Sequence, residues 1–317
     1  MLTLLFAFFL VAVGIGLLYW GGEILVDNAV ALARTIKMSN MMIGLTVVAF
    51  GTSCPELAAT LTAALKGSPD IAVGNVFGSN VANIGLILAI SAIIMPLGVK
   101  IGFVRREGVF MLFATALVYP LMIDGEVARW EGVLLFVLLV AFIVRVLKDP
   151  GAEQVVSVDE IEDCEDRPVW KASLGVAAGI GLLVGGAQSL IVGATDIALA
   201  IGIEERIIGF TVVAFGTSLP ELAASIAAAR QKHGDIVLGN LVGSNIFNLL
   251  CILGITSMVV PIPVPAASMS FDYWAMVVTS TLMLAFLWSR LKMVRAEGVT
   301  LLVLYMGYVV FLYFAHP

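Results

Sequence analysis

Residues 43–56 read IGLTVVAFGTSCPE, and residues 208–221 read IGFTVVAFGTSLPE. Twelve of these fourteen positions are identical. The same alignment, in which position 43 corresponds to position 208, continues without a gap, because GNVFGSN at 74–80 is matched by GNLVGSN at 239–245. The chain is therefore an internal duplication. Its two copies match best at the positions where they are most polar.

The rest of the sequence is strongly apolar. Hydrophobic residues make up 61% of the 317 positions, charged residues make up 13%, and the mean hydropathy is +1.07. A soluble fold of this size could not hide so much apolar surface, so most of the chain should lie in lipid. This composition excludes a cytosolic enzyme, a secreted disulfide scaffold, a nucleic-acid-binding module and a disordered protein. The three cysteines, Cys54, Cys164 and Cys251, have no spacing typical of a thiolate metal site.

Ten stretches are long and apolar enough to cross a bilayer, which takes about 20 residues of helix. They predict an all-α membrane protein with ten transmembrane helices. The first stretch lies near 3–20, with a continuation to about 33 left open. The others lie near 40–65, 71–95, 107–123, 130–147, 172–195, 205–229, 236–260, 273–290 and 297–314.

The predicted organisation has three parts: a first five-helix repeat at 1–147, an acidic linker at 148–170 and a second five-helix repeat at 171–317. Five spans separate equivalent positions, and because five is odd the two copies should cross the membrane in opposite directions. Such inverted-topology repeats are common in secondary transporters, which bind their substrate near the midplane. A duplicated structural scaffold without transport is the alternative.

The distribution of basic residues predicts the orientation. With the N-terminus outside, 14 of the 17 lysines and arginines fall on the cytoplasmic side, and only Lys66, Arg129 and Arg206 fall outside. We therefore expect an integral protein of the cell membrane, with both termini outside and the acidic linker in the cytoplasm. Its surroundings are the lipid bilayer, and neither a nucleic acid nor an obligatory protein partner is expected.

Glu56 and Glu221 occupy equivalent positions in the middle of apolar stretches. An ionised residue near the bilayer centre costs at least about 2.5–3.5 kcal/mol on insertion scales, so it needs a partner. The pseudo-symmetry should point the two carboxylates at each other and create a cation site. A protonated, purely structural pair of glutamates is the alternative.

The residues just before each glutamate favour the cation site. Proline removes a helical hydrogen bond, and a nearby glycine adds backbone freedom. The helix should therefore kink or break and free carbonyls such as those of Ala49 and Ala214. Unpaired carbonyls are tolerated at membrane depth only where they line a cavity or bind an ion. A simple proline kink packed against neighbouring helices is the alternative.

The span after each motif should form the opposite wall. Asn75, Ser79 and Asn83 are four residues apart and share one helix face, and the second copy repeats this pattern. Glycine pairs at 74 and 78 and at 239 and 243 should allow close helix packing. We select Ser79, Asn83, Ser244 and Asn248 as ligand candidates. Interhelical hydrogen bonding is the simpler role for Asn75, Asn80, Asn240 and Asn245.

The donor set consists of carboxylates, hydroxyls, amides and carbonyls, all of which are hard oxygens. Ca²⁺ takes six to eight such ligands in flexible geometry, and Na⁺ accepts the same donors. Zinc, copper and iron would require histidine or cysteine. Two carboxylates would balance one Ca²⁺ and leave the occupied site nearly neutral. No cofactor is expected.

The G-T-S-x-P-E and G-S-N-x-x-N elements, each present twice, resemble the two repeats of the sodium/calcium exchangers of the cation/calcium exchanger superfamily. The resemblance covers essentially the whole chain and implies exchange of Ca²⁺ against Na⁺ by alternating access. It implies Glu56 and Glu221 as central ligands of the two ions. The further oxygen donors that it implies are Thr52, Ser53, Thr217, Ser218, Ser79, Asn83, Ser244, Asn248, Ala49 and Ala214.

Other functions remain open at this stage. A desolvated glutamate readily takes up a proton, so H⁺/Ca²⁺ antiport with the same carboxylates is the main alternative. An intramembrane hydrolase with Ser53 or Ser218 as nucleophile is disfavoured, because neither serine has a nearby histidine or lysine as base. We therefore expect a transporter rather than an enzyme. Some members of the family have aspartate at the position of Asn248, potassium-dependent ones among them, so asparagine here disfavours potassium dependence.

Overall fold

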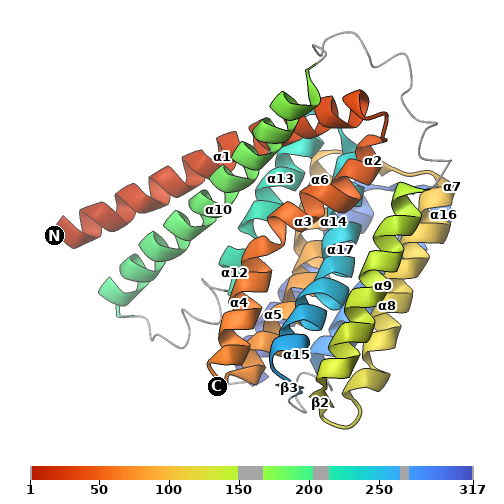
Figure 1. Ribbon diagram of the computed structural model, residues 1–317. Coiled ribbons are helices and arrows are strands. Elements are labelled where there is room, and N and C mark those ends of the chain that lie inside the picture. The colour runs from red at the N-terminus through yellow and green to blue at the C-terminus, as the bar shows by residue number, and fades with distance from the viewer. Residues whose placement is uncertain (1, 149–166, 203–213, 265–270, 316–317) are drawn as a thin grey trace.

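A computed structural model describes residues 2–148, 167–202, 214–264 and 271–315, and these residues are mostly helical (Figure 1). Six of the described helices are long and apolar enough to cross a membrane, and a bent pair of helices could form a seventh span. Many large apolar side chains are exposed on the outer faces, including Phe9, Trp20, Val137 and Val303. The described residues therefore have the fold of a helical integral membrane protein.

The described elements of the first half are α-helical segments, two short strands, the π-type turns η1, η2 and η3, and the 3₁₀ turn η4. In chain order they are α1 (Leu2–Thr35), α2 (Asn40–Ile43), η1 (Gly44–Val48), α3 (Ala49–Thr52), α4 (Cys54–Leu65), α5 (Pro69–Ala82), η2 (Asn83–Leu88), α6 (Ala89–Ile94), β1 (Leu97–Gly98), α7 (Ile101–Phe103), η3 (Val104–Gly108), α8 (Val109–Val118), η4 (Pro120–Met122), β2 (Glu126–Val127) and α9 (Arg129–Leu147).

The described elements of the second half follow a similar order. They are α10 (Val169–Ala200), α12 (Ala214–Thr217), α13 (Leu219–Arg230), α14 (Gly234–Phe247), the π-type turn η8 (Asn248–Ile252), α15 (Leu253–Val259), β3 (Ile262–Pro263), α16 (Tyr273–Arg290), β4 (Lys292–Met293) and α17 (Arg295–Ala315). The bounds of α12, α13 and α14 coincide with those of α3, α4 and α5 when the two copies are aligned. The sequence duplication is therefore also a duplication of local structure.

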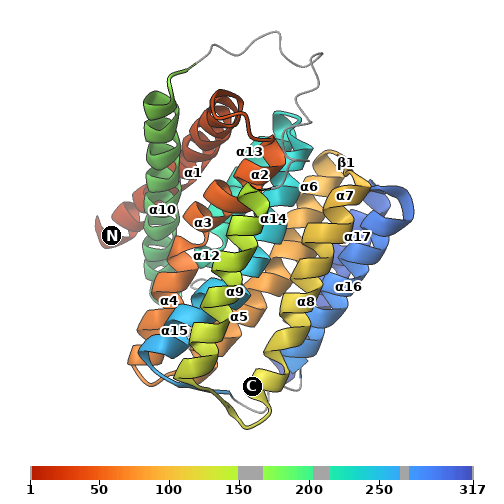
Figure 2. The ribbon, with the colours of Figure 1, turned by 45° about the vertical axis from the view of Figure 1, so that its right-hand side comes forward.

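Two of the apolar stretches form the centre of the bundle. Within the span Gly234–Val259, all of the most apolar window is buried, and within Pro69–Ile94 72% of it is buried. The corresponding windows of the other four long helices are between 11% and 33% buried. The helices α5, η2 and α6 and the helices α14, η8 and α15 therefore occupy the interior, and α4, α8, α9, α16 and α17 pack against them (Figure 2).

Two short antiparallel strand pairs connect the halves. The strand β1 pairs with β4, and β2 pairs with β3. The helices α9 and α17 begin with the same glutamate cap: Glu131 accepts the N–H of Ala128 at 2.7 Å, and Glu297 accepts the N–H of Val294 at 2.9 Å. These caps satisfy backbone donors at the two helix starts, where the helix itself supplies no acceptor.

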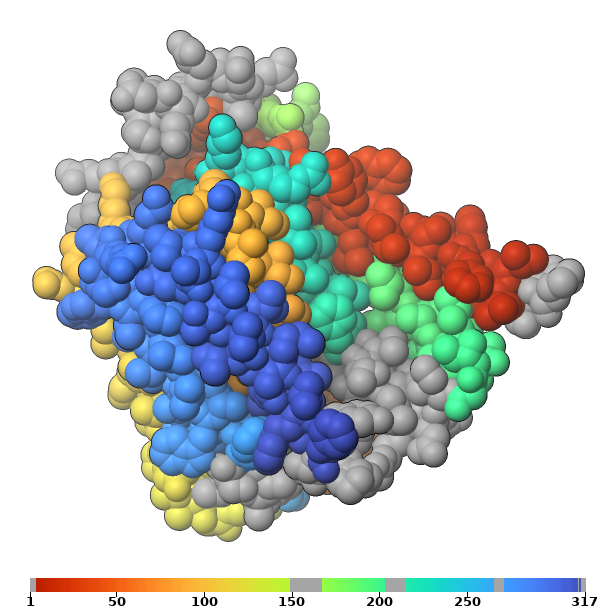
Figure 3. All heavy atoms as spheres, turned by 180° about the vertical axis from the view of Figure 1, so that it is seen from behind, coloured from red at the N-terminus to blue at the C-terminus, as the bar shows by residue number. Residues whose placement is uncertain are grey.

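The helices α1 and α10 form a closely packed antiparallel pair that projects from the side of the bundle (Figures 1 and 3). Small residues make this approach possible. A Cβ added at Gly14 would lie 2.8 Å from the carbonyl oxygen of Gly186, and one added at Gly21 would lie 2.9 Å from the backbone nitrogen of Leu183. The pair contacts the rest of the molecule mainly through α13, α2 and α12.

The ten predicted stretches lie largely in described helix, apart from residues 205–213 of the seventh, which lie outside the described residues; six of the described helices, or seven with the bent pair, are long and apolar enough to span a membrane. The first stretch continues as helix beyond residue 20, because α1 runs unbroken to Thr35. Residues 149–166 of the predicted acidic linker also lie outside the described residues, and the prediction for them is not tested.

Candidate functional site

Each copy of the repeated motif contains a helix break at its serine. The helix α3 ends at Thr52 and α4 begins at Cys54, and the two segments of this span meet at 41°. Ser53 between them has φ −81° and ψ 1°, and Ser218 has φ −88° and ψ 5°. The following prolines cause the break, because Pro55 and Pro220 have no N–H to donate to the preceding turn.

The prediction that the break frees the Ala49 carbonyl is wrong. This oxygen accepts the backbone N–H of Ser53 at 3.0 Å and the hydroxyl of Thr52 at 3.4 Å. The reason is the position of the break: proline removes the bond four residues before itself, and this bond would have gone to Gly51. In the second copy the N–H of Ser218 bonds to Phe215, three residues back, at 3.2 Å.

The two central glutamates meet, and each contacts the serine of the other copy. Ser53 Oγ donates to Glu221 Oε1 at 3.2 Å, and Ser218 Oγ donates to Glu56 Oε1 at 3.1 Å. The two carboxyl groups are close enough to interact electrostatically. Both glutamates are only 1% exposed. The crossed pair of hydrogen bonds therefore brings two acidic groups together in the interior.

A second crossed pair surrounds the first. Thr52 Oγ1 contacts Asn240 Oδ1 at 3.4 Å, and Thr217 Oγ1 contacts Asn75 Oδ1 at 3.4 Å. The amide of Asn75 also donates to Thr60 Oγ1 at 2.8 Å. These two asparagines therefore hydrogen-bond between helices, as the sequence predicts, and each accepts the threonine hydroxyl of the other copy's motif.

The four ligand candidates of the following spans lie in the same interior region. Ser79, Asn83, Ser244 and Asn248 are all buried, and Asn248 Nδ2 donates to Ser79 Oγ at 2.9 Å across the two copies. Asn83 begins η2 and Asn248 begins η8, so each stands at the start of a π-type turn. Such turns often occur at functional sites. The sequence does not predict these π-type turns, because no residue in these stretches signals a change of helix type.

Buried oxygens without a hydrogen-bond partner gather at this site. Among the described residues seven buried side-chain atoms have no partner, and six of them belong to the two motif pairs. These six are Glu56 Oε2, Glu221 Oε2, Asn80 Oδ1, Asn83 Oδ1, Ser244 Oγ and Asn248 Oδ1. Such atoms are costly to leave unpaired, so a concentration of them requires an explanation. All six are hard oxygens, the donor type that Ca²⁺ and Na⁺ accept.

The donor set does not favour a transition metal. No group of three or more histidine, cysteine, aspartate or glutamate side chains is placed so that it could hold a metal ion in the described parts of the chain. The site has two carboxylates, and its other side-chain donors are neutral. A cation held there would therefore be bound by a few charged and several neutral oxygens.

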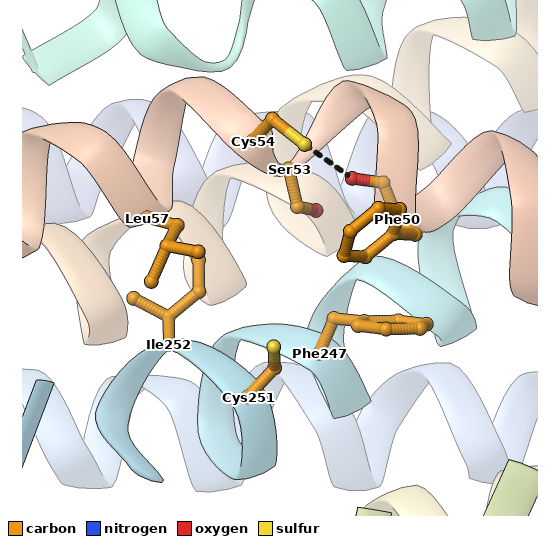
Figure 4. Close-up of a pocket in the computed structure, with 7 residues that line it drawn as sticks. All are labelled: Phe50, Ser53, Cys54, Leu57, Phe247, Cys251 and Ile252. Carbon is orange, nitrogen blue, oxygen red and sulfur yellow. Dashed lines mark hydrogen bonds between the residues drawn. The ribbon is translucent and has the colours of Figure 1, made fainter. Parts of the chain in front are cut away.

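A small pocket adjoins the site at Ser53 (Figure 4). It lies between the broken span and the α14–η8 span, and it is otherwise lined by Phe50, Cys54, Leu57, Phe247, Cys251 and Ile252. The Cys54 thiol donates to the Phe50 carbonyl at 3.2 Å, as the dashed line shows. The phenyl rings of Phe50 and Phe247 have centroids 5.8 Å apart. The wall of this pocket is therefore apolar, with the Ser53 hydroxyl as its link to the glutamates.

The crossed serine bonds lead to a prediction about affinity. If this site binds Ca²⁺, as the resemblance to the sodium/calcium exchangers implies, Ser53→Ala and Ser218→Ala should each raise the Ca²⁺ concentration for half-maximal flux by about tenfold or more, because a hydrogen bond to a charged group contributes about 1.5–3 kcal/mol. Flux into proteoliposomes at varied Ca²⁺ measures this. Ser91→Ala is the control, since Ser91 is buried but bonds only to the Ile87 carbonyl of its own helix. Equal affinities in all three variants would contradict the prediction.

Comparison with known proteins places this geometry in context. The family model described as sodium/calcium exchanger protein matches residues 6–148 and 171–314. The chain is 31% identical over 344 residues to the sodium/calcium exchanger MaX1 of Methanosarcina acetivorans, with 97% of this chain and 98% of MaX1 covered. It is 33% identical over 321 residues to the inner membrane protein YrbG of Escherichia coli, with 99% of both chains covered.

The fold is also similar to solved structures. Superposition on the sodium–calcium exchanger NCX_Mj, soaked with Na⁺ and no Ca²⁺, gives a TM-score of 0.86 at 32% sequence identity, covering 97% of this chain and 99% of that one. A second structure of NCX_Mj, soaked with Na⁺ and Sr²⁺, gives a TM-score of 0.85. Sequence and fold agree over nearly the whole chain, and the protein belongs to the sodium/calcium exchanger family.

Proposed function

We propose that this protein exchanges Na⁺ for Ca²⁺ across the cell membrane and binds both ions at Glu56 and Glu221. The observation that carries the proposal is the crossed pair of serine–glutamate hydrogen bonds, which holds two buried carboxyl groups side by side. Two negative charges balance one Ca²⁺. Na⁺ accepts the same oxygen donors, so Na⁺ ions would bind at these oxygens when Ca²⁺ is absent.

The wider ligand set follows from the unpartnered oxygens. Asn83, Ser244 and Asn248 each offer a buried oxygen that accepts no hydrogen bond within the described residues. Together with the free Oε2 atoms of the two glutamates they make five donors, close to the six to eight that Ca²⁺ takes. The remaining candidates are Thr52, Ser53, Thr217, Ser218, Ser79 and the carbonyls of Ala49 and Ala214. The Ala49 carbonyl oxygen accepts the Ser53 N–H and the Thr52 hydroxyl, so it can contribute to ion binding only when that hydroxyl donates to Asn240 Oδ1 instead.

The proposed architecture is two five-helix repeats of opposite topology, at 1–147 and 171–317, joined by a cytoplasmic linker at 148–170. The matching bounds of α3, α4 and α5 with α12, α13 and α14 support it. Both termini would lie outside, because this orientation places 14 of the 17 basic residues on the cytoplasmic side. The repeats would then present the site alternately to the two sides of the membrane.

The counter-ion is tested by ⁴⁵Ca²⁺ uptake into proteoliposomes with the Na⁺, K⁺ and H⁺ gradients varied independently. We expect an outward Na⁺ gradient to drive uptake and a K⁺ gradient to have no effect. Protein-free liposomes and liposomes with equal Na⁺ on both sides are the controls. Uptake that is driven by a pH gradient and is indifferent to Na⁺ would reject Na⁺/Ca²⁺ exchange and favour H⁺/Ca²⁺ antiport.

A further inference from the structure

The asparagines around the site hydrogen-bond asymmetrically, although the two copies have the same residues at these positions. Asn83 Nδ2 donates to Asn245 Oδ1 at 3.1 Å. Its counterpart Asn248 donates instead to Ser79 Oγ at 2.9 Å. The two ligand-candidate amides are therefore held by different partners, an asparagine in one case and a serine in the other.

The mirror image of the Asn83–Asn245 bond would join Asn248 to Asn80, and the acceptor on Asn80 is present and unused. Asn80 is the counterpart of Asn245 in the alignment of the two copies. The amide nitrogen of Asn80 is turned back to the carbonyl of Val76 at 2.6 Å. The Asn80 Oδ1 atom is buried and accepts no hydrogen bond among the described residues. Asn248 thus has an unoccupied acceptor at the position equivalent to the one that Asn83 uses.

The mirror image of the Asn248–Ser79 bond would join Asn83 to Ser244, and the acceptor on Ser244 is also unused. Ser244 is the counterpart of Ser79, and it is fully buried. Its hydroxyl has no hydrogen-bond partner within the described part of the chain. Asn83 could donate to it as Asn248 donates to Ser79. The two atoms that complete a mirrored network are therefore both among the seven unpartnered buried atoms of the described residues.

A pair of equivalent methionines follows the same asymmetry, because one contacts an asparagine amide and the other lies in the equivalent position of the second copy. The amide nitrogen of Asn245 contacts Met111 Sδ on α8 at 3.7 Å. Met276 on α16 is the counterpart of Met111 in the second copy, and α16 packs against α5, which carries Asn80. Both methionines are fully buried. A mirrored network would therefore have a sulfur acceptor for the amide of Asn80.

We propose that Asn80 and Asn245 are a matched pair of positioning residues that exchange roles when the protein changes conformation. In the conformation described here, Asn245 holds Asn83 and Ser79 holds Asn248. In the other conformation, Asn80 holds Asn248 and Ser244 holds Asn83. This inference rests on the proposed function, because alternating access in a protein of two inverted repeats exchanges the conformations of the repeats.

The test compares Asn245→Ala with Asn80→Ala. The first removes an acceptor used in the described conformation, and the second removes one used in the other conformation. The protein, labelled with 5-fluorotryptophan at its five tryptophans, reports the two populations by ¹⁹F NMR in nanodiscs. We expect Asn245→Ala to lower the proportion of the described conformation about fivefold and Asn80→Ala to raise it about fivefold, the effect of one hydrogen bond. The double variant should return to within about twofold of the wild type.

Two conservative variants keep the test decisive if an alanine variant does not fold. Met111→Leu and Met276→Leu preserve volume and should shift the populations in opposite directions, as Asn245→Ala and Asn80→Ala do. Shifts in the same direction, or no shift in any variant, would overturn the proposal. The ¹⁹F NMR populations test the exchange of roles and need no transport. The Na⁺-driven ⁴⁵Ca²⁺ flux of the wild type tests only the proposed function. A failure of the inference can therefore be told apart from a failure of the proposed function.

Discussion

Replacing either central glutamate by glutamine should reduce Ca²⁺ flux more than about hundredfold. Glu56→Gln and Glu221→Gln each remove one of the two negative charges that would balance the ion, and one oxygen that would bind it. Loss of an outer-shell partner of a metal ligand already costs about 10–100-fold, and loss of a central ligand should cost more. The fold should survive, because glutamine has nearly the same shape and its amide oxygen can accept the serine hydroxyl.

The measurement is Na⁺-driven ⁴⁵Ca²⁺ uptake, with size-exclusion chromatography to show that each variant folds. Glu131→Gln is the matched control. Glu131 is also buried, but it caps the N–H of Ala128 at the start of α9 and has no contact with the site in the described residues. Its flux should be close to that of the wild type. Full activity in either central variant would refute the proposed site.

Gly239→Val should destabilise the protein and remove transport with it. A Cβ at this glycine would collide with the Met41 carbonyl oxygen and lie 2.9 Å from the Leu45 nitrogen. Both atoms belong to backbone, so no side chain can rotate away, and α14 would have to move from α2 and η1. Overpacking typically costs about 1–3 kcal/mol, and at its upper end this lowers the melting temperature of a chain of 317 residues by roughly 4–5 °C.

Thermal unfolding in detergent, followed by tryptophan fluorescence, measures this effect. Gly307→Val is the control, because Gly307 is exposed on α17 and an added Cβ meets no described atom within 4 Å. Transport should fall in Gly239→Val, since α14 and η8 carry Asn240, Ser244 and Asn248. An unchanged melting temperature would show that the helix pair tolerates a wider separation than the geometry indicates.

The positions of the helices could be predicted because their signals are local. An apolar stretch of sufficient length predicts a helix in lipid, and a proline after a glycine predicts a break. The break occurs at Ser53 and at Ser218, within the two motifs. Of the two carbonyls predicted to be freed, the prediction is wrong for Ala49, because the freed position depends on the register of the hydrogen bonds before the proline, whereas the Ser218 N–H bonds to Phe215 and not to Ala214. The Ala49 carbonyl remains bonded.

The partners within the site could not be predicted in the same way. The duplication indicates that Glu56 and Glu221 should face each other, but it does not indicate that each accepts the serine hydroxyl of the other copy. It also implies equal surroundings for Asn83 and Asn248, whereas the structure gives them different partners. Equal sequences allow unequal packing, because two interlocked copies can adopt complementary conformations.

The sequence by itself determined the helices, the duplication and the polar residues of each copy, because helix length, proline and residue type act within a few positions of the chain. Only the tertiary structure decided which oxygen faces which. Contacts between the two copies join residues that are far apart in the chain, such as Ser53 with Glu221 and Ser79 with Asn248. They depend on how the copies pack, and no local pattern carries that information.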